Sequence, residues 1–313
     1  MSGELRKPRA LAAGDRIAVV APASGFDRAE FDAGIEELRA LGFEPEWEGS
    51  VFERAAFTAG APDARVGALE HAWHSSLVRG IIGARGGYGS VHLLPALEAS
   101  RLEGPPKAFI GYSDLTSLLT FLTCQCGVVA FHGPTVAGRL SGGPARYDRA
   151  SFLRVLTAAA PAGELETGVA LEALIAGEAT GRLLGGTLTQ LAAACGTPYA
   201  LTPWDDTILL LEDVNERPYR LDRLFQQLRL SGALSRVRGV LLGTFPGGDE
   251  PDGNITARDT LATLLDGVAG PVVFGFPTGH VAGAALTVPL GVRVRLVAGA
   301  MSRLVIEEAA VAA

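Results

Sequence analysis

The sequence predicts an α/β protein of two domains: an N-terminal doubly wound domain with a parallel sheet, and a C-terminal β-rich, partly barrel-like α+β domain. Three observations predict this fold class. Apolar runs alternate with amphipathic helical segments over the first 135 residues, short apolar runs between Gly/Pro turns fill the second half, and the pattern loosens between them. We therefore expect an α/β domain over residues 1–137, a connection over 138–177 and the β-rich domain over 178–313.

In the N-terminal half, strands and helices follow one another in order. Arg16–Pro22 is almost wholly apolar, as expected of a strand buried on both faces, and Phe31, Ile35 and Leu38 then share one face of a helix that ends at Gly42. The alternation continues with the weak strand FEPEWE, the helix ARVGALEHAWHS, the strand RGIIGA, the strand KAFIG, the helix LTSLLTFLT and the strand VVAFH. A parallel sheet of this kind binds ligands at the carboxyl ends of its strands.

The connection and the second half have a different pattern. An Ala-rich helix lies between the loose segments SGGPARYD and PAGELETG of the connection. One clear helix follows in the second half, Arg220–Ser231, which places its apolar residues on one stripe and has Pro218 at its start. The predicted strands are TILLLED, VRGVLLGTF, PVVFGFP, ALTVPLG and VRVRLVAG.

Composition excludes several classes of protein. The 313 residues include 27 Lys and Arg against 34 Asp and Glu, a formal charge of −7, and 48% of them are hydrophobic. High hydrophobicity with modest charge is the reverse of the composition of a disordered chain. The acidic balance, without a basic block, argues against nucleic acid or an anionic membrane as the partner. We expect a small-molecule partner.

Cysteine usage and targeting signals predict a cytoplasmic location. Three cysteines, Cys124, Cys126 and Cys195, without Cys-x-x-Cys or His-x-x-x-His spacing, argue against a disulfide framework or a structural zinc site. The best apolar run near the start, Ile17–Ala23, is too short for a secretory signal, and no run of about 18 apolar residues predicts a membrane span. We expect a soluble, reduced, cytoplasmic protein.

Gly111-Tyr112-Ser113-Asp114 is the first candidate for chemistry. A serine between an apolar strand and an amphipathic helix is typical of a nucleophile elbow, in which backbone N–H groups such as that of Asp114 can hold an oxyanion. The match to Gly-x-Ser-x-Gly is partial because Leu115 stands at the fifth position. The alternative is a helix N-cap, a position that Ser and Asp favour regardless of function.

A glycine-rich turn, Gly83 to Gly89, follows the preceding strand. In a parallel sheet it would lie beside Ser113, and its glycines would let backbone N–H groups approach a substrate. Two alternatives stay open: a tight turn without a ligand, and a phosphate cradle. The spacing Gly83-x-x-Gly86-x-x-Gly89 departs from that of dinucleotide loops.

A nucleophilic serine needs a base and an acid. The five candidate bases are His71, His74, His92, His132 and His280. His132 ends a strand, and His280 lies in a Gly/Pro loop after another, where functional residues concentrate. Glu212 ends the apolar run TILLL, so its burial requires a partner, whereas Asp213 and Glu216 suit a solvated loop or a cap.

Taken together, these segments resemble the LD-carboxypeptidase family of serine peptidases. The resemblance runs over nearly the whole chain, through GDRIAVVAPAS, IIGARGGYG, FIGYSDLTSLL, FHGPTVAG, LLGGTLTQLAAACGTPY, ILLLEDVNERPYRLDRLFQQL and FGFPTGH. It implies that Ser113 is the nucleophile, Glu212 the acid and His280 the base. It also implies an oxyanion hole of two backbone N–H groups, from Asp114 and from Gly87, with Gly86 as the reserve for the second.

The resemblance further implies a function. We expect removal of a terminal D-alanine from murein tetrapeptides in cell-wall recycling, with Arg85, Gly86 and Tyr112 as candidate substrate-binding residues and without a cofactor or metal. The expected partners are the small peptide substrate and a second copy of the chain in a homodimer. Two alternatives remain: a related hydrolase of peptidyl-nucleotide antibiotics, and a non-catalytic module that binds a nucleotide or a sugar.

Overall fold

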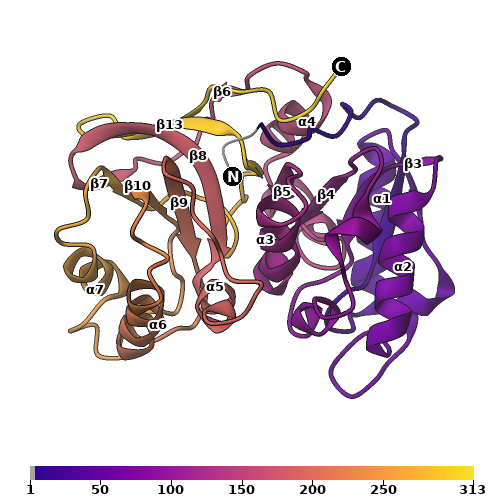
Figure 1. Cartoon of the computed structure of the whole chain (residues 1–313), viewed down its shortest axis with the longest axis horizontal. Helices are drawn as coiled ribbons and strands as arrows, with labels where there is room; N and C mark the ends of the chain where they lie inside the picture. Colours follow the sequence, from indigo (N-terminus) through magenta and orange to yellow (C-terminus); the bar gives the residue numbers. More distant parts are fainter. Residues whose placement is uncertain (1–3) are drawn as a thin grey trace.

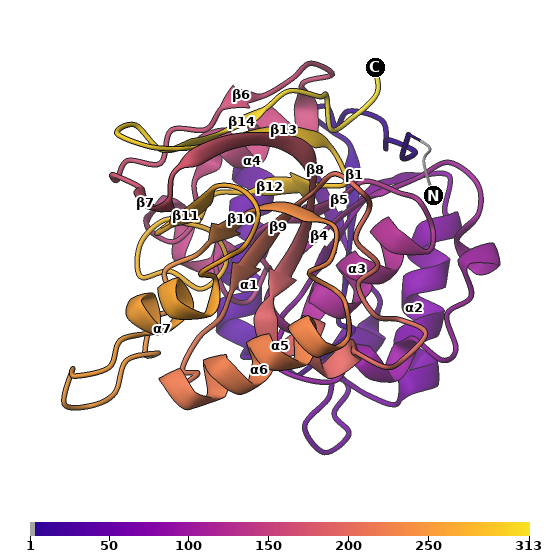
Figure 2. The same cartoon turned by 60° about the vertical axis from the view of Figure 1, so that its left-hand side comes forward.

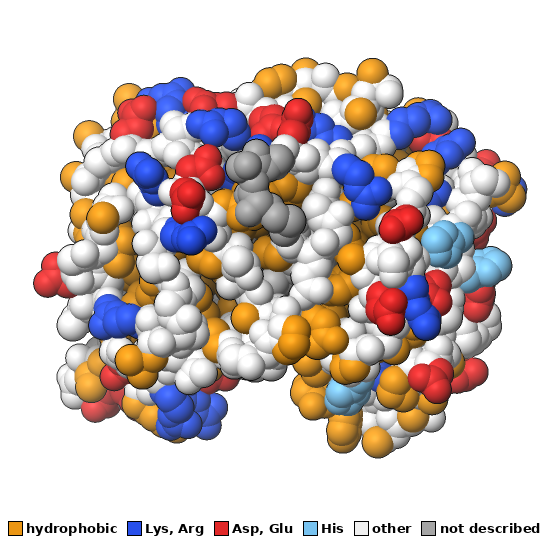
Figure 3. All heavy atoms as spheres, in the orientation of Figure 1, with side chains coloured by type: hydrophobic (Ala, Val, Ile, Leu, Met, Phe, Trp, Pro, Cys, Tyr) orange, Lys and Arg blue, Asp and Glu red, His pale blue; other side chains and the backbone are white. Residues whose placement is uncertain are grey.

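Two β-sheets lie side by side in the structure, a computed structural model that describes residues 4–313 (Figure 1). The predicted α/β fold class, with a parallel sheet in the first half and a β-rich second half, is confirmed. The surface in the same orientation has a notch at its lower edge between the two lobes (Figure 3). On that face acidic and basic side chains are interspersed rather than gathered by sign.

Within residues 4–313, the first sheet has six strands in the order β12-β5-β4-β3-β1-β2. They are β1 (Arg16–Val20), β2 (Glu44–Glu46), β3 (Val78–Gly83), β4 (Ala108–Gly111), β5 (Ala130–His132) and β12 (Val288–Leu290). The first five pair in parallel, as predicted, and β4 and β5 are buried along their whole length, which explains their continuous apolar sequence. Antiparallel β12 was expected in the second domain, but it pairs with β5.

Helices cover both faces of this sheet. They are α1 (Arg28–Ala40), α2 (Pro62–His74) and α3 (Thr116–Cys124), and α1 lies on the opposite side from α2 and α3 (Figure 2). Asp27 caps α1 by accepting the N–H groups of Ala29 and Glu30, and Phe31, Ile35 and Leu38 form its buried face, as predicted. Short 3-10 helices are η1 (Gly49–Phe52), η2 (Ser90–Leu93), η3 (Ala99–Leu102), η4 (Ser113–Leu115) and η5 (Leu140–Ala145).

The second sheet, again as far as the structure describes the chain, has eight strands in the order β6-β14-β13-β8-β9-β10-β11-β7. They are β6 (Gly163–Glu164), β7 (Glu172–Ile175), β8 (Gly177–Thr187), β9 (Thr207–Glu212), β10 (Val237–Leu242), β11 (Val272–Phe274), β13 (Arg293–Ala298) and β14 (Arg303–Ile306). Strands β8 to β11 are parallel, and the remaining pairs are antiparallel. The sheet curls until β7 and β11 contact β13, which fits the partly barrel-like expectation.

Three helices accompany the second sheet: α5 (Leu188–Ala194), α6 (Pro218–Leu230) and α7 (Ala257–Leu264). Only α6 was predicted, and it begins at Pro218 as expected. The boundaries of the predicted connection, 138–177, stay a prediction. Within that range lie α4 (Arg149–Thr157), the Ala-rich helix, which packs on β12, and two strands, β6 and β7, that join the second sheet.

Candidate active site

Ser113 stands at the turn between β4 and α3 with a φ of +63°. A residue with a Cβ seldom adopts this left-handed conformation, and strain of this kind concentrates at functional sites. The capping alternative is wrong, since the N-cap positions of η4 and α3 are Tyr112 and Leu115 and neither helix has a side-chain cap. Within residues 4–313 the Ser113 hydroxyl has no hydrogen-bond partner, so it is available to a substrate.

The glycine-rich turn lies directly against Ser113, as predicted. A Cβ at Gly86 would lie 3.0 Å from Ser113 Cβ and 3.3 Å from Ser113 Oγ, so the turn approaches closely only because this residue is glycine. Gly87 has a φ of +94°. Across the described chain, the N–H groups of Gly86, Gly87 and Asp114 donate no hydrogen bond. Three free donors beside one hydroxyl can hold a developing oxyanion.

The buried carboxylate of Asp114 joins the turn to the serine. It accepts the backbone N–H groups of Gly89 at 3.2 Å and Ser90 at 2.8 Å, and Ser90 Oγ donates to the Asp114 carbonyl at 2.6 Å. The side chain of Asp114 is therefore structural, whereas its N–H group stays free.

Glu212 and His280 form a hydrogen-bonded pair. Glu212 ends β9 with no exposed surface, and its Oε2 accepts His280 Nδ1 at 2.8 Å and the His280 backbone N–H at 2.7 Å. Burial alone raises the pKa of Glu212, but the hydrogen bond and electrostatic attraction of His280, the attraction of His132 and the hydrogen bond from Thr187 together outweigh it and lower this pKa to about 2. The carboxylate is thus charged at neutral pH. Its bond to Nδ1 leaves Nε2 of His280 as the atom that can exchange a proton.

Hydrogen bonds between the two halves of the chain bring Ser113 near this pair. The Thr187 backbone N–H, at the end of β8, donates to Thr116 Oγ1 in the first turn of α3 at 3.1 Å, and the Thr187 hydroxyl donates to Glu212. Gln190 of α5 adds a second link, because its amide bonds both Ser117 and Asp114. The helix that starts beside the serine is therefore joined to the strand that carries the acid.

The loop after His280 is held from the first half of the chain. The buried Arg139 guanidinium donates to the carbonyl of Val281 at 2.7 Å and to that of Gly283 at 2.9 Å. The same guanidinium lies 5.8 Å from the ring centroid of Tyr112, whose ring in turn lies 5.1 Å from that of His280. Tyr112, next to Ser113, therefore contacts the imidazole. No hydrogen bond of 3.5 Å or less joins Ser113 Oγ to His280 in the described part of the chain.

The rival residues have different surroundings. His71 and His74 are exposed on α2, as expected. His132 is close to the site but fully buried, and burial lowers its pKa to about 4. Neither of its ring nitrogens has a hydrogen-bond partner in the described part of the chain. Asp213 is buried rather than solvated and accepts the N–H and hydroxyl of Thr189 at 2.7 Å each. Of the candidate pairs, only Glu212 and His280 have the geometry of an acid that orients a base.

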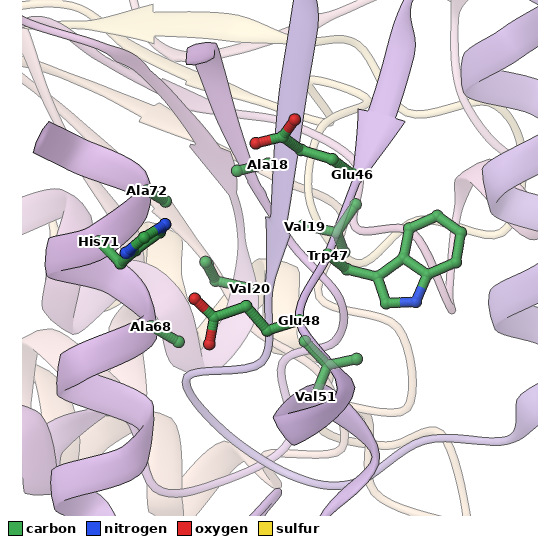
Figure 4. Close-up of a pocket in the computed structure, with 10 residues that line it drawn as sticks. All are labelled: Ala18, Val19, Val20, Glu46, Trp47, Glu48, Val51, Ala68, His71 and Ala72. Carbon is green, nitrogen blue, oxygen red and sulfur yellow. The ribbon is translucent and has the colours of Figure 1, made fainter. Parts of the chain in front are cut away.

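Neither a metal site nor the small pocket beside α2 competes with this location. In residues 4–313 no group of three or more His, Cys, Asp or Glu side chains is placed to hold a metal ion. A pocket of about 120 Å³ lies between α2, β1 and the segment that follows β2 (Figure 4). Its polar lining consists of His71, Glu46 and Glu48, and it contains none of the predicted site residues.

Comparisons with known proteins assign the family. The chain matches the model of the LD-carboxypeptidase N-terminal domain over residues 17–133 and that of the LD-carboxypeptidase C-terminal domain over residues 180–296. It is 39% identical to a putative carboxypeptidase of Streptomyces coelicolor, with 94% of each chain covered. It is 28% identical to a probable murein peptide carboxypeptidase of Bacillus subtilis, with 92% of this chain and 90% of the relative covered.

Two solved structures have a similar fold. A muramoyltetrapeptide carboxypeptidase from Oxalobacter formigenes superposes with a TM-score of 0.81 at 28% identity, covering 94% of this chain and 99% of the other. The microcin C7 self-immunity protein MccF, bound to aspartyl sulfamoyl adenosine, superposes with a TM-score of 0.87 at 24% identity, covering 98% and 99%. With both domain models matched and a relative of this identity along the chain, the protein belongs to the LD-carboxypeptidase family of serine carboxypeptidases.

Proposed function

We propose that this carboxypeptidase releases the terminal D-alanine from murein tetrapeptides during cell-wall recycling, and that it does so in the cytoplasm. The murein substrate is supported by the names of the Bacillus subtilis relative and of the Oxalobacter formigenes structure. No helix among the described residues is long and apolar enough to cross a membrane. The observation that carries the catalytic assignment is the hydrogen-bonded pair of Glu212 and His280, beside a serine in a strained conformation.

In the first step Ser113 attacks the scissile carbonyl. Its Oγ forms a bond to the carbonyl carbon while its proton passes to Nε2 of His280, and Glu212 stabilises the imidazolium through Nδ1–H. The step requires His280 and Ser113 to come within about 2.6–3.2 Å, and catalytic hydrogen bonds of this kind often tighten only when substrate is bound. The ring contact between Tyr112 and His280 already holds the imidazole near the serine turn.

Backbone N–H groups are available to bind the negative charge that develops on the carbonyl oxygen. We assign the oxyanion hole to the N–H groups of Asp114 and Gly87, with that of Gly86 as the reserve, because all three are free of other hydrogen bonds in the described chain. His280 then returns the proton to the departing amine, and D-alanine leaves. Water repeats the cycle on the acyl-enzyme, and no cofactor takes part.

Mass spectrometry of the purified protein incubated with a murein tetrapeptide tests the proposal. We expect loss of a single alanine, to give the tripeptide. An intact tetrapeptide after prolonged incubation with folded protein would contradict it.

The likeness to MccF supports a second candidate, hydrolysis of a peptidyl-nucleotide conjugate. In this chain α6 begins at Pro218, soon after Glu212, so the segment after the acid forms a helix rather than an extended loop for a nucleotide. Assay of a peptidyl-nucleotide and a murein tetrapeptide side by side separates the two. We expect the larger kcat/KM for the tetrapeptide, and the reverse order would favour the second candidate.

We also propose that the protein acts as a homodimer. Light scattering during size-exclusion chromatography tests this proposal. We expect a mass near twice the 32.5 kDa of the chain, and a mass equal to that of one chain would contradict it.

A further inference from the structure

A pocket of about 370 Å³ opens beside the glycine-rich turn. It is lined by Ser24, Gly25, Phe26, Arg54, Ala56, Phe57 and Arg85, which come from the loop after β1, the segment after η1 and the turn after β3. The lining contains two guanidinium groups and no carboxylate, although the chain as a whole carries a formal charge of −7. The electrostatic character of this pocket is therefore opposite to that of the protein.

The two arginines converge on one glycine. Arg85 Nη1 donates to the Gly25 carbonyl at 3.2 Å, and a Cβ at Gly25 would lie only 2.5 Å from Arg54 Nε. Arg54 is fixed by donating to the carbonyl of Phe26 at 2.7 Å and by stacking over the Phe26 ring at 5.3 Å. Neither guanidinium is within 4.0 Å of a described carboxylate. Two cations held together without an acid favour the binding of an anion between them.

The pocket adjoins the candidate oxyanion hole. Ser24 Oγ accepts the backbone N–H of Tyr88 at 3.0 Å, and a Cβ at Gly87 would lie 2.6 Å from it. Ser24 and Ser113 therefore contact the same short turn, one at Gly87 and the other at Gly86. The pocket therefore lies next to the turn that carries two of the candidate oxyanion donors, Gly86 and Gly87.

An exposed aromatic ring forms one wall. Phe57 lines the pocket with 62% of its surface exposed, and its ring lies 5.3 Å from that of Tyr88. The pocket thus combines an apolar wall with paired guanidiniums, a combination suited to a small amino-acid residue that ends in a carboxylate.

We propose that this pocket binds the terminal carboxylate of the peptide, with Arg54 and Arg85 as its ligands. The inference rests on the proposed carboxypeptidase function and deepens it. It explains how an exopeptidase selects the last residue: the free carboxylate occupies the guanidinium pair while the preceding carbonyl lies between Ser113 and the free N–H groups. Hydrogen bonds from a guanidinium to a carboxylate are charge-assisted and directional. They therefore determine which peptide carbonyl lies at Ser113, as well as how tightly the peptide binds.

The test compares two substrates that differ only at this group, a murein tetrapeptide and its terminal carboxamide. The proteins are the wild type, Arg54→Met and Arg85→Met, with Arg28→Met as the matched control, because Arg28 is an exposed arginine over the Phe52 ring and outside the pocket. We expect the wild type and the control to prefer the carboxylate. Each pocket variant should lose about ten- to a hundredfold in kcat/KM on the carboxylate, mainly through KM, and little on the carboxamide.

Equal losses on both substrates, or no loss on either, would overturn the inference. Calorimetric binding of the same two peptides in a Ser113→Ala background separates this result from failure of the proposed function. If the wild type hydrolyses neither peptide, the function is wrong. Tighter binding of the carboxylate form, abolished by Arg85→Met, would still support the pocket, and equal binding of the two forms would refute it.

Discussion

Ser113 holds a backbone conformation that costs about 1–3 kcal/mol for a residue with a side chain. The bonds of the Asp114 carboxylate to Gly89 and Ser90 help to hold the turn that sustains it. Among residues 4–313, the Ser113 hydroxyl has no hydrogen-bond partner and the neighbouring N–H groups have no acceptors, so both are available to a substrate carbonyl. From the sequence, Ser113 and Glu212 could be singled out because each stands at or just after the end of an apolar strand, and His280 because it lies in the loop after another.

His132 leads to a prediction about how the stability of the protein depends on pH. In the unfolded chain an imidazole binds a proton near pH 6.5, but burial lowers the pKa of His132 to about 4, and this outweighs the opposite effect of the nearby Glu212 carboxylate. Between these pH values the unfolded state binds more protons than the folded state does. The free energy of unfolding therefore falls as the pH falls, by about 3 kcal/mol in all. His132→Gln removes this contribution and breaks no hydrogen bond to any residue that the structure describes.

Urea unfolding at pH 7 and pH 4.5 measures the effect. The free energy of unfolding of the wild type should drop more between these pH values than that of the variant. The same drop in both proteins would show that His132 does not titrate in this way.

The elements show where sequence patterns stop being informative. Strands β4 and β9 were predicted because each contains a continuous apolar run, whereas β8 was missed because its sequence, GEATGRLLGGT, is rich in glycine. Those glycines have a tertiary cause. A Cβ at Gly181 would lie 1.8 Å from the Asp206 carbonyl oxygen, and one at Gly185 would lie 2.0 Å from that of Leu210. Strand β8 therefore approaches β9 this closely because these two positions have no side chain. The pairing of β12 with β5 is likewise set by tertiary packing.

The glycine-rich turn gives a prediction for an element that supports the serine. Gly86→Ala would place a methyl group 3.0 Å from Ser113 Cβ and displace the hydroxyl, so kcat should fall about 10²-fold. Gly67→Ala is the matched control, since it lies in α2 with open space around its Cβ position, and it should leave kcat unchanged. Steady-state kinetics on the tetrapeptide measure both. Full activity of Gly86→Ala would show that the turn does not constrain the serine.

The loop that carries His280 gives a second prediction for an element. Arg139→Met removes the donors that hold the carbonyls of Val281 and Gly283, so the imidazole should be less well positioned. We expect kcat to fall about 10–10²-fold with KM little changed, and partial rescue by Arg139→Lys. The thermal midpoint of each variant is measured in parallel. Equal loss in Arg139→Lys and Arg139→Met, or a change in KM alone, would argue against a positioning role.

For the whole molecule, the site exists because two sheets pack together. The Thr187 N–H in one half donates to the Thr116 hydroxyl in the other. Arg139 donates to the carbonyls of Val281 and Gly283, which lie 142 and 144 residues further along the chain. None of these partners could be paired from the sequence, because such contacts depend on the docking of the halves and leave no local pattern. The resemblance to a known family, rather than periodicity, is what predicted that the three distant residues act together.

The proposed mechanism requires Ser113 and His280 to act as one unit. The most direct test is the turnover of the tetrapeptide by Ser113→Ala, by His280→Ala and by the double variant. We predict that each single change lowers kcat by about 10⁴–10⁶ with little change in the thermal midpoint, and that the double variant is no slower than the worse single one. Near-full turnover by Ser113→Ala, or losses that multiply in the double variant, would contradict it.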